Sequence, residues 1–104
     1  MRPRKVRDIE SVLSHKGFER SPQKQHHKFF FLAVNGKKTH IFTYLSHGET
    51  EYNSSLMGKI KYQLKFKSNE KAEEFFDCPF TKDDYIKMLI TEGNAGCVNL
   101  LNIR

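Results

Sequence analysis

The feature that most constrains this chain is the Asn35-Gly36 pair, which divides the apolar stretch 24–44 into two runs. Asn-Gly readily supplies two consecutive residues with positive φ, as a two-residue type I′ turn requires. Such a turn joins two antiparallel strands and sets their register, with Val34 opposite Lys37. The sequence therefore predicts a β-hairpin that carries the histidine pair His26-His27 at its open end.

Side chains alternate along a strand, so the expected pairing divides the hairpin into two faces. One face holds His27, Phe29, Phe31, Ala33, Lys38, His40, Phe42 and Tyr44, and the other holds His26, Lys28, Phe30, Leu32, Val34, Thr39, Ile41, Thr43 and Leu45. We expect the first, aromatic face to pack under helices and the second, mixed face to stay open. His26 would then lie on the open face and His27 at the margin of the core, and a one-residue slip in register would exchange them.

Helical spacing and capping residues flank the hairpin on both sides. Apolar residues at helical intervals predict helices over 7–16, 56–64 and 70–76, and Thr81 with Asp84 resembles a capping box that opens a fourth helix. A short strand is expected over 18–21. The predicted fold is α+β: one domain over 1–104, with a three-stranded antiparallel sheet, helices on one of its faces, an extra C-terminal helix and a tail over 93–104.

Charge is unevenly distributed along the chain. Its 18 basic and 12 acidic residues give +6, and the first 67 residues alone hold 14 basic and 5 acidic residues. Lys24, Lys28, Lys37 and Lys38 all belong to the predicted hairpin, which favours a polyanion such as nucleic acid as partner, against the alternative of an ordinary solvated surface. No apolar stretch is long enough to span a bilayer, and we expect a cytoplasmic protein without a membrane partner.

Metal and disulfide chemistry are not indicated. Cys78 and Cys97 are 19 positions apart with no Cys-x-x-Cys pair, which favours ordinary thiols. A cluster of His26 with His27, His40 and His47 is disfavoured because the expected pairing puts His26 on one face and both His27 and His40 on the other.

Several short motifs together resemble the HicA-type toxins, which are small RNA-cleaving proteins with a double-stranded-RNA-binding-domain-like fold. The matching residues are His15-Lys16-Gly17-Phe18 after the first helix, the His-x-x-Phe spacing of His26 and Phe29, Gly36 in the hairpin, His47-Gly48, and Asp83-Asp84-Tyr85 in the last helix. The resemblance covers roughly residues 7–89, and 67–80 would be an insertion relative to that family.

This resemblance implies a metal-independent endoribonuclease of toxin–antitoxin type. His26 would be the base that activates an RNA 2′-hydroxyl, with His27 as its substitute and Lys24 and Lys28 holding phosphate. Imidazole suits this role because it gains and loses a proton near neutral pH, and positioned acid/base catalysis accelerates a reaction by about 10²–10⁴-fold. The implied partners are RNA and a cognate antitoxin protein, with no cofactor, and the protein would be a monomer or a homodimer.

Two other functions remain open at this point. Lys24 and Gln25 stand where the family signature has glycine and a small residue, which favours a non-catalytic RNA- or DNA-binding module on the same fold. An exposed sheet that serves only protein association is the third alternative. The hairpin aromatics could stack on bases, as in single-strand RNA-binding sheets, but we expect them to be used as core, except for Phe30 near His26.

Overall fold

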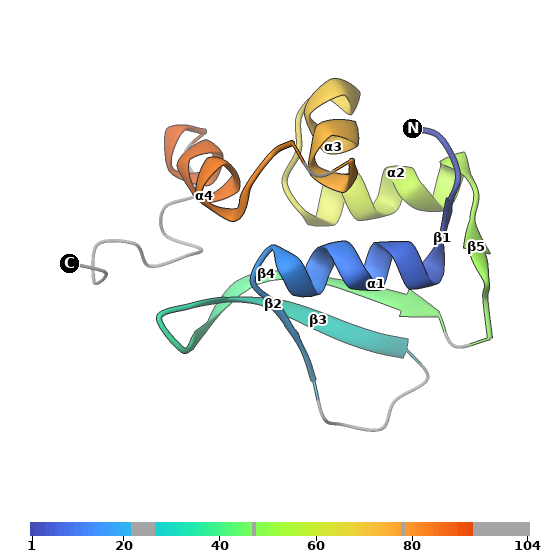
Figure 1. Cartoon of the computed structure of the whole chain (residues 1–104), viewed down its shortest axis with the longest axis horizontal. Helices are drawn as coiled ribbons and strands as arrows, with labels where there is room; N and C mark the ends of the chain where they lie inside the picture. The colour runs from blue at the N-terminus through green and yellow to red at the C-terminus, as the bar shows by residue number, and fades with distance from the viewer. Residues whose placement is uncertain (22–26, 47, 78, 93–104) are drawn as a thin grey trace.

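A computed structural model of the chain describes residues 1–21, 27–46, 48–77 and 79–92. The elements are β1 (Arg4–Lys5), α1 (Val6–His15), β2 (Phe18–Arg20), β3 (His27–Val34), β4 (Lys37–Ser46), β5 (Glu51–Tyr52), α2 (Ser54–Gln63), α3 (Asn69–Phe76) and α4 (Lys82–Thr91). Strands β2, β3 and β4 form an antiparallel sheet in that order, and β1 pairs with β5. Helices α1 to α4 lie on one side of the three-stranded sheet (Figure 1). The α+β fold with its three-stranded antiparallel sheet is therefore confirmed.

The type I′ turn of the hairpin is confirmed. Asn35 and Gly36 have φ values of 52° and 76°, and Val34 lies opposite Lys37. Beyond the turn the predicted register is wrong by two residues, because a bulge on β4 places Phe31 opposite Phe42. Since two is a whole period of a strand, the shift leaves every described side chain of the hairpin on its predicted face.

The predicted burial of the two hairpin faces is wrong. The mixed face is the one under the helices: Phe30 is 3% exposed, and Leu32 and Ile41 are fully buried. On the aromatic face, Phe42 is 40% exposed. The reason lies in the helical layer, which brings its own rings to the core, namely Phe66, Phe75, Phe76, Phe80 and Tyr85 together with Phe18 of β2. These rings fill the space that the hairpin aromatics were expected to fill.

The four predicted helices are found close to their expected bounds. Asn53 caps α2 by accepting a hydrogen bond from the Leu56 amide. Ser68 caps α3, and the capping box of α4 between Thr81 and Asp84 is complete in both directions. The hydrogen bonds from Thr81 lower the pKa of Asp84. The short β1–β5 pair was not predicted, because two-residue strands leave no alternation to detect.

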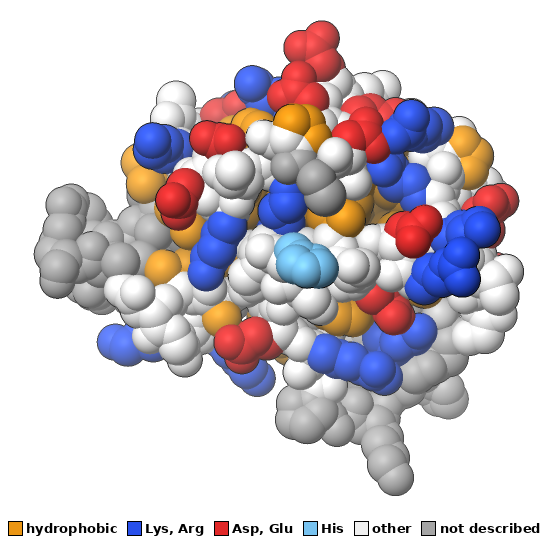
Figure 2. Space-filling model, viewed as in Figure 1, with side chains coloured by type: hydrophobic (Ala, Val, Ile, Leu, Met, Phe, Trp, Pro, Cys, Tyr) orange, Lys and Arg blue, Asp and Glu red, His pale blue; other side chains and the backbone are white. Residues whose placement is uncertain are grey.

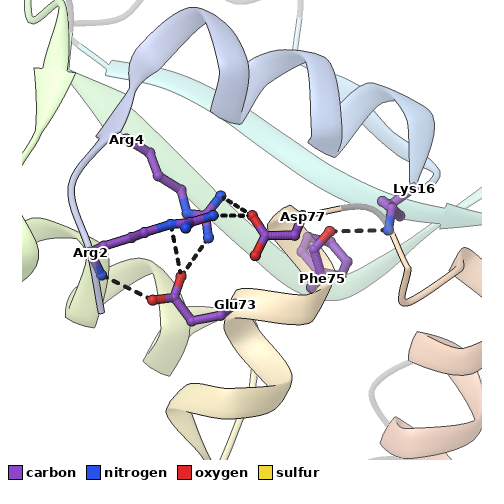
Figure 3. A network of polar contacts seen from close by, with 6 residues as sticks. All are labelled: Arg2, Arg4, Lys16, Glu73, Phe75 and Asp77. Carbon is purple, nitrogen blue, oxygen red and sulfur yellow. Dashed lines mark hydrogen bonds and ion pairs between the residues drawn. The ribbon is translucent and has the colours of Figure 1, made fainter.

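Residues 67–80, expected to be an insertion, supply part of the main core. Phe75 lies within 5.1–6.5 Å of the rings of Phe18, Phe66, Phe76 and Tyr85. The buried Lys16 Nζ donates to the Phe75 carbonyl at 3.0 Å (Figure 3). It also donates to the Phe80 carbonyl. Lys16 thus binds one carbonyl group in the last turn of α3, where a positive charge is favoured, and one in the segment between α3 and α4.

An ion-pair cluster joins the N-terminal strand to α3 (Figure 3). Arg4 reaches Glu73 at 2.5 Å and Asp77 at 3.1 Å, and Arg2 contacts the same two carboxylates. Partial burial raises the pKa of Glu73, but the hydrogen bonds from Arg4 and the Arg2 amide, with both positive charges, outweigh it and leave this pKa below its ordinary value of 4.5.

Candidate nucleic-acid interface

The side of the sheet opposite the helices carries a connected row of rings, which we call the aromatic face and define as His27, Phe29, Phe31, Phe42 and Tyr44. Along this row the ring centroids of Phe31 and Phe42 are 6.0 Å apart, those of Phe42 and Phe29 are 6.1 Å apart, and those of Phe29 and Tyr44 are 5.4 Å apart. The row ends where His27 stacks on Tyr44 at 4.9 Å with an interplanar angle of 11°. These distances are typical of interacting ring pairs.

Strand pairing explains why the rings form one row. Phe31 lies directly opposite Phe42, and Phe29 lies opposite Tyr44. Directly opposed side chains in an antiparallel pair touch, and alternation keeps the whole set on one face. The bulge has a local cause, since Thr39 donates its hydroxyl to the Leu32 carbonyl at 2.9 Å and accepts from the Ile41 amide at 3.1 Å.

The predicted phosphate-binding lysines divide between two environments. Lys38 lies on the aromatic side, with its Nζ 4.7 Å from the centre of the Phe31 ring, and Lys37 is exposed beside the turn. Lys28 lies on the helix-covered face, where its Nζ is 2.6 Å from a Glu10 carboxylate oxygen and its side chain is 18% exposed. Lys28 is therefore separated from the aromatic face. Lys24 lies outside the described residues, as does His26.

His27 stands at the end of the aromatic face, beside a cavity of about 170 Å³ between the sheet and α2. The cavity is lined by His27, Tyr44, Ser46, Tyr52, Lys59 and Gln63, among others. His27 is half-buried, and its Nδ1 is buried without a hydrogen-bond partner in the described part of the chain. Such an atom in a native protein calls for an explanation, and a ligand-binding or catalytic role is one.

A larger cavity, of about 620 Å³, lies beside α1, β1 and β5. Its basic lining residues are Lys5, Arg7 and Lys28, and its acidic lining residues are Glu10, Glu49 and Glu51. Because the opposite charges are equal in number, this cavity does not favour a polyanion. In the view of Figure 2, too, basic and acidic side chains are interspersed over the helices rather than gathered into a basic patch. Stacking rings therefore distinguish the aromatic face more than charge does.

Sequence reasoning missed two parts of this site. It assigned Phe29, Phe31, Phe42 and Tyr44 to the core, although the aromatic content of 66–85 was a signal that the helices could fill the core themselves. It also gave no role to Lys59 of α2. No local pattern could have linked Lys59 to His27, because tertiary packing alone brings α2 to the end of β4.

Comparisons with known proteins add no assignment. Scans of the chain against protein-family models, curated proteins and solved structures found no match. Over the described ranges, no three His, Cys, Asp or Glu side chains gather as a metal site would need, and no helix there is long and apolar enough to cross a membrane. The resemblance to HicA-type toxins stays a prediction.

Proposed function

We propose that this protein binds single-stranded RNA across the aromatic face. The observation that carries the proposal is the connected row of rings on a sheet face that no described helix covers, with Phe42 40% exposed. Each base stacked on an aromatic side chain contributes about 1–3 kcal/mol to binding. A row of rings can therefore hold successive bases of one strand.

The geometry favours a single strand over a duplex. A ring can stack only on a base whose flat face is free, and bases in a duplex are already stacked on their neighbours. Lys38 and Lys37 lie at the turn end of the row, where their ammonium groups can contact phosphates of a strand that crosses it. Such contacts make the affinity fall as salt rises.

The test is fluorescence anisotropy of a labelled ten-nucleotide RNA with Phe42→Ala and a matched control, Tyr62→Ala. Tyr62 is 79% exposed on α2, outside the aromatic face, so the Tyr62→Ala change removes a ring of similar size from another surface. We expect Phe42→Ala to weaken binding by about 5- to 150-fold and Tyr62→Ala to leave it unchanged. Equal effects of the two changes on affinity would refute the proposal. Tighter binding of single-stranded DNA than of RNA would show that RNA is not the preferred ligand.

A second candidate function is metal-independent RNA cleavage, and the position of His27 favours it. Its ring joins the aromatic face to a cavity that Lys59 also lines. A histidine there can take the proton from a 2′-hydroxyl, whose oxygen attacks the adjacent phosphorus. The bond from phosphorus to the 5′-oxygen then breaks, and that oxygen receives a proton, leaving a cyclic phosphate. A lysine ammonium can stabilise the charged intermediate.

Cleavage of labelled RNA in EDTA tests this candidate with His26→Ala, His27→Ala and the control His15→Ala. His15 is exposed on α1, where its Nδ1 lies 2.8 Å from the Ser11 carbonyl oxygen. Loss of cleavage in one of the first two variants, with RNA binding retained, would identify the catalytic histidine. No cleavage by any form, with binding intact, would leave the binding module as the function. A cognate antitoxin partner, a cytoplasmic location and a monomeric or dimeric state stay predictions.

A further inference from the structure

The cavity beside His27 is too small for a whole nucleotide and has a lining suited to a flat ring. Its volume is about 170 Å³, below the roughly 300–1,000 Å³ of sites that enclose drug-sized ligands. The stacked rings of His27 and Tyr44 form one part of the wall, and Leu56 and Ile60 of α2 form an apolar part. Flat aromatic walls beside an apolar patch, with polar groups around them, fit a planar heterocycle better than a hydrated ion.

The polar groups of the cavity are held in fixed orientations. The Thr43 hydroxyl donates to Gln63 Oε1 at 2.5 Å, which leaves the amide N–H groups of Gln63 as available donors. At the end of β4, the Ser46 amide donates to the Tyr52 hydroxyl at 2.6 Å, and that hydroxyl lies 3.4 Å from Ser46 Oγ. Lys59, which is exposed, supplies the positive charge of the lining.

We infer that this cavity takes one nucleobase of the bound strand and that Lys59 contacts a phosphate next to it. The inference rests on the proposed RNA binding and adds a site that distinguishes one base of the RNA from the others. It follows from the position of the cavity at the His27 end of the aromatic face, where a strand that leaves the row of rings would enter it. Amide donors at a base edge select a base that presents a carbonyl acceptor.

The base that fits this chemistry best is uracil, because cytosine, the other single-ring base of RNA, has one carbonyl group and an amino donor in place of the second. Uracil carries two carbonyl acceptors on a single six-membered ring, so it suits both the donors of Gln63 and the small volume. Adenine has two fused rings, and its amino group would meet a donor where an acceptor is needed. A mismatch of this kind changes affinity by about 5- to 150-fold.

The experiment compares the affinities of ten-nucleotide oligouridine and oligoadenosine for the full chain and for Gln63→Met. Methionine keeps the length of the side chain and removes the donors. We expect the wild-type protein to prefer oligouridine by at least about fivefold, and Gln63→Met to lose this preference while its affinity for oligoadenosine stays the same. Thermal unfolding of the variant verifies that it is folded.

A second pair of variants tests the phosphate contact independently of Gln63. Lys59→Ala is expected to weaken RNA binding and reduce the dependence of log affinity on log salt by about one unit, and Lys61→Ala, on the same helix but outside the cavity lining, is the matched control. Equal affinity of the wild-type protein for both oligonucleotides, or a preference that survives Gln63→Met, would overturn the inference while RNA binding stands. Failure to bind either oligonucleotide would instead overturn the proposed function and this inference with it.

Discussion

Phe75 of α3 lies at the centre of the aromatic core, and its removal tests whether residues 67–80 belong to that core. The side chain is fully buried, and the centroids of the Phe66, Phe76 and Tyr85 rings lie 5.1–5.3 Å from its own. The buried Lys16 ammonium lies 5.0 Å from the same ring. Phe75→Ala therefore creates a cavity bordered by rigid rings, which cannot easily collapse to fill it.

The expected cost follows from these contacts. Truncation of a buried phenylalanine to alanine costs about 3–5 kcal/mol, and the lost ring–ring contacts place this site toward the upper end. A domain of this size has a total unfolding free energy of about 5–15 kcal/mol, so the variant would lose a large part of it. Urea unfolding followed by circular dichroism measures the difference, and the midpoint should fall by about 2 M.

Tyr62→Ala is the matched control, because this ring is 79% exposed and its loss should change the unfolding free energy by less than about 0.5 kcal/mol. If Phe75→Ala lowered the urea midpoint no more than Tyr62→Ala, then α3 would not be packed as described. Residues 67–80 would then have to be regarded as an appended segment rather than as part of the main core.

Three further predictions test the ion pairs, the turn after α1 and the two hairpin lysines. Because the pKa of Glu73 is lower in the folded chain than its ordinary 4.5, its contribution to stability is present above that pH and is lost as the pH falls below it; Glu73→Gln should flatten this part of a pH series of thermal melts. Gly17→Ala should lower the urea midpoint by an amount equivalent to about 1–3 kcal/mol, because Gly17 has a φ of 92°, a backbone conformation that strains any residue with a Cβ. Lys38→Ala should weaken RNA binding and reduce its salt dependence, whereas Lys28→Ala, which loses only the ion pair with Glu10, should leave both nearly unchanged; the reverse result in the same anisotropy titrations would contradict the face assignment.

The parts of the fold that were predicted correctly depend on local chemistry. The Asn35-Gly36 turn follows from the ease with which these two residues adopt positive φ, and the Thr81 capping box follows from two side chains three positions apart. The side-chain sets of the two hairpin faces were also correct, because a bulge that shifts the register by two residues preserves alternation. The bulge itself was not predictable, since it depends on how Thr39 bonds across to Leu32 once the strands have paired.

The candidate site could be predicted only in part. The residues that form it can be read from the hairpin sequence, but their exposure depends on how the helices pack. His27 was singled out as one of two histidines at the open end of the hairpin, but its contact with the cavity depends on where α2 packs. Lys28 and Lys38 are equally basic in the sequence, yet Lys28 is paired with Glu10 of α1, whereas Lys38 lies over the half-buried ring of Phe31. Charge counts alone could not distinguish them.

The two hairpin faces compete for burial under the helices, and the sequence of a single strand does not show which face is buried. Both faces are apolar enough to be buried, but the described residues form a single layer of helices, which covers one of them. That layer already contains the rings of Phe66, Phe75 and Tyr85, and the compact side chains of Leu32 and Ile41 pack against such a surface without needing further large rings. The hairpin rings are then left on the outer face. Because they do not pack in the core, core packing does not explain why they are aromatic. A row of partly exposed rings on a protein surface is typical of a binding site, and this competition for the helices, rather than the histidine motif, is the reason why we propose RNA as the ligand.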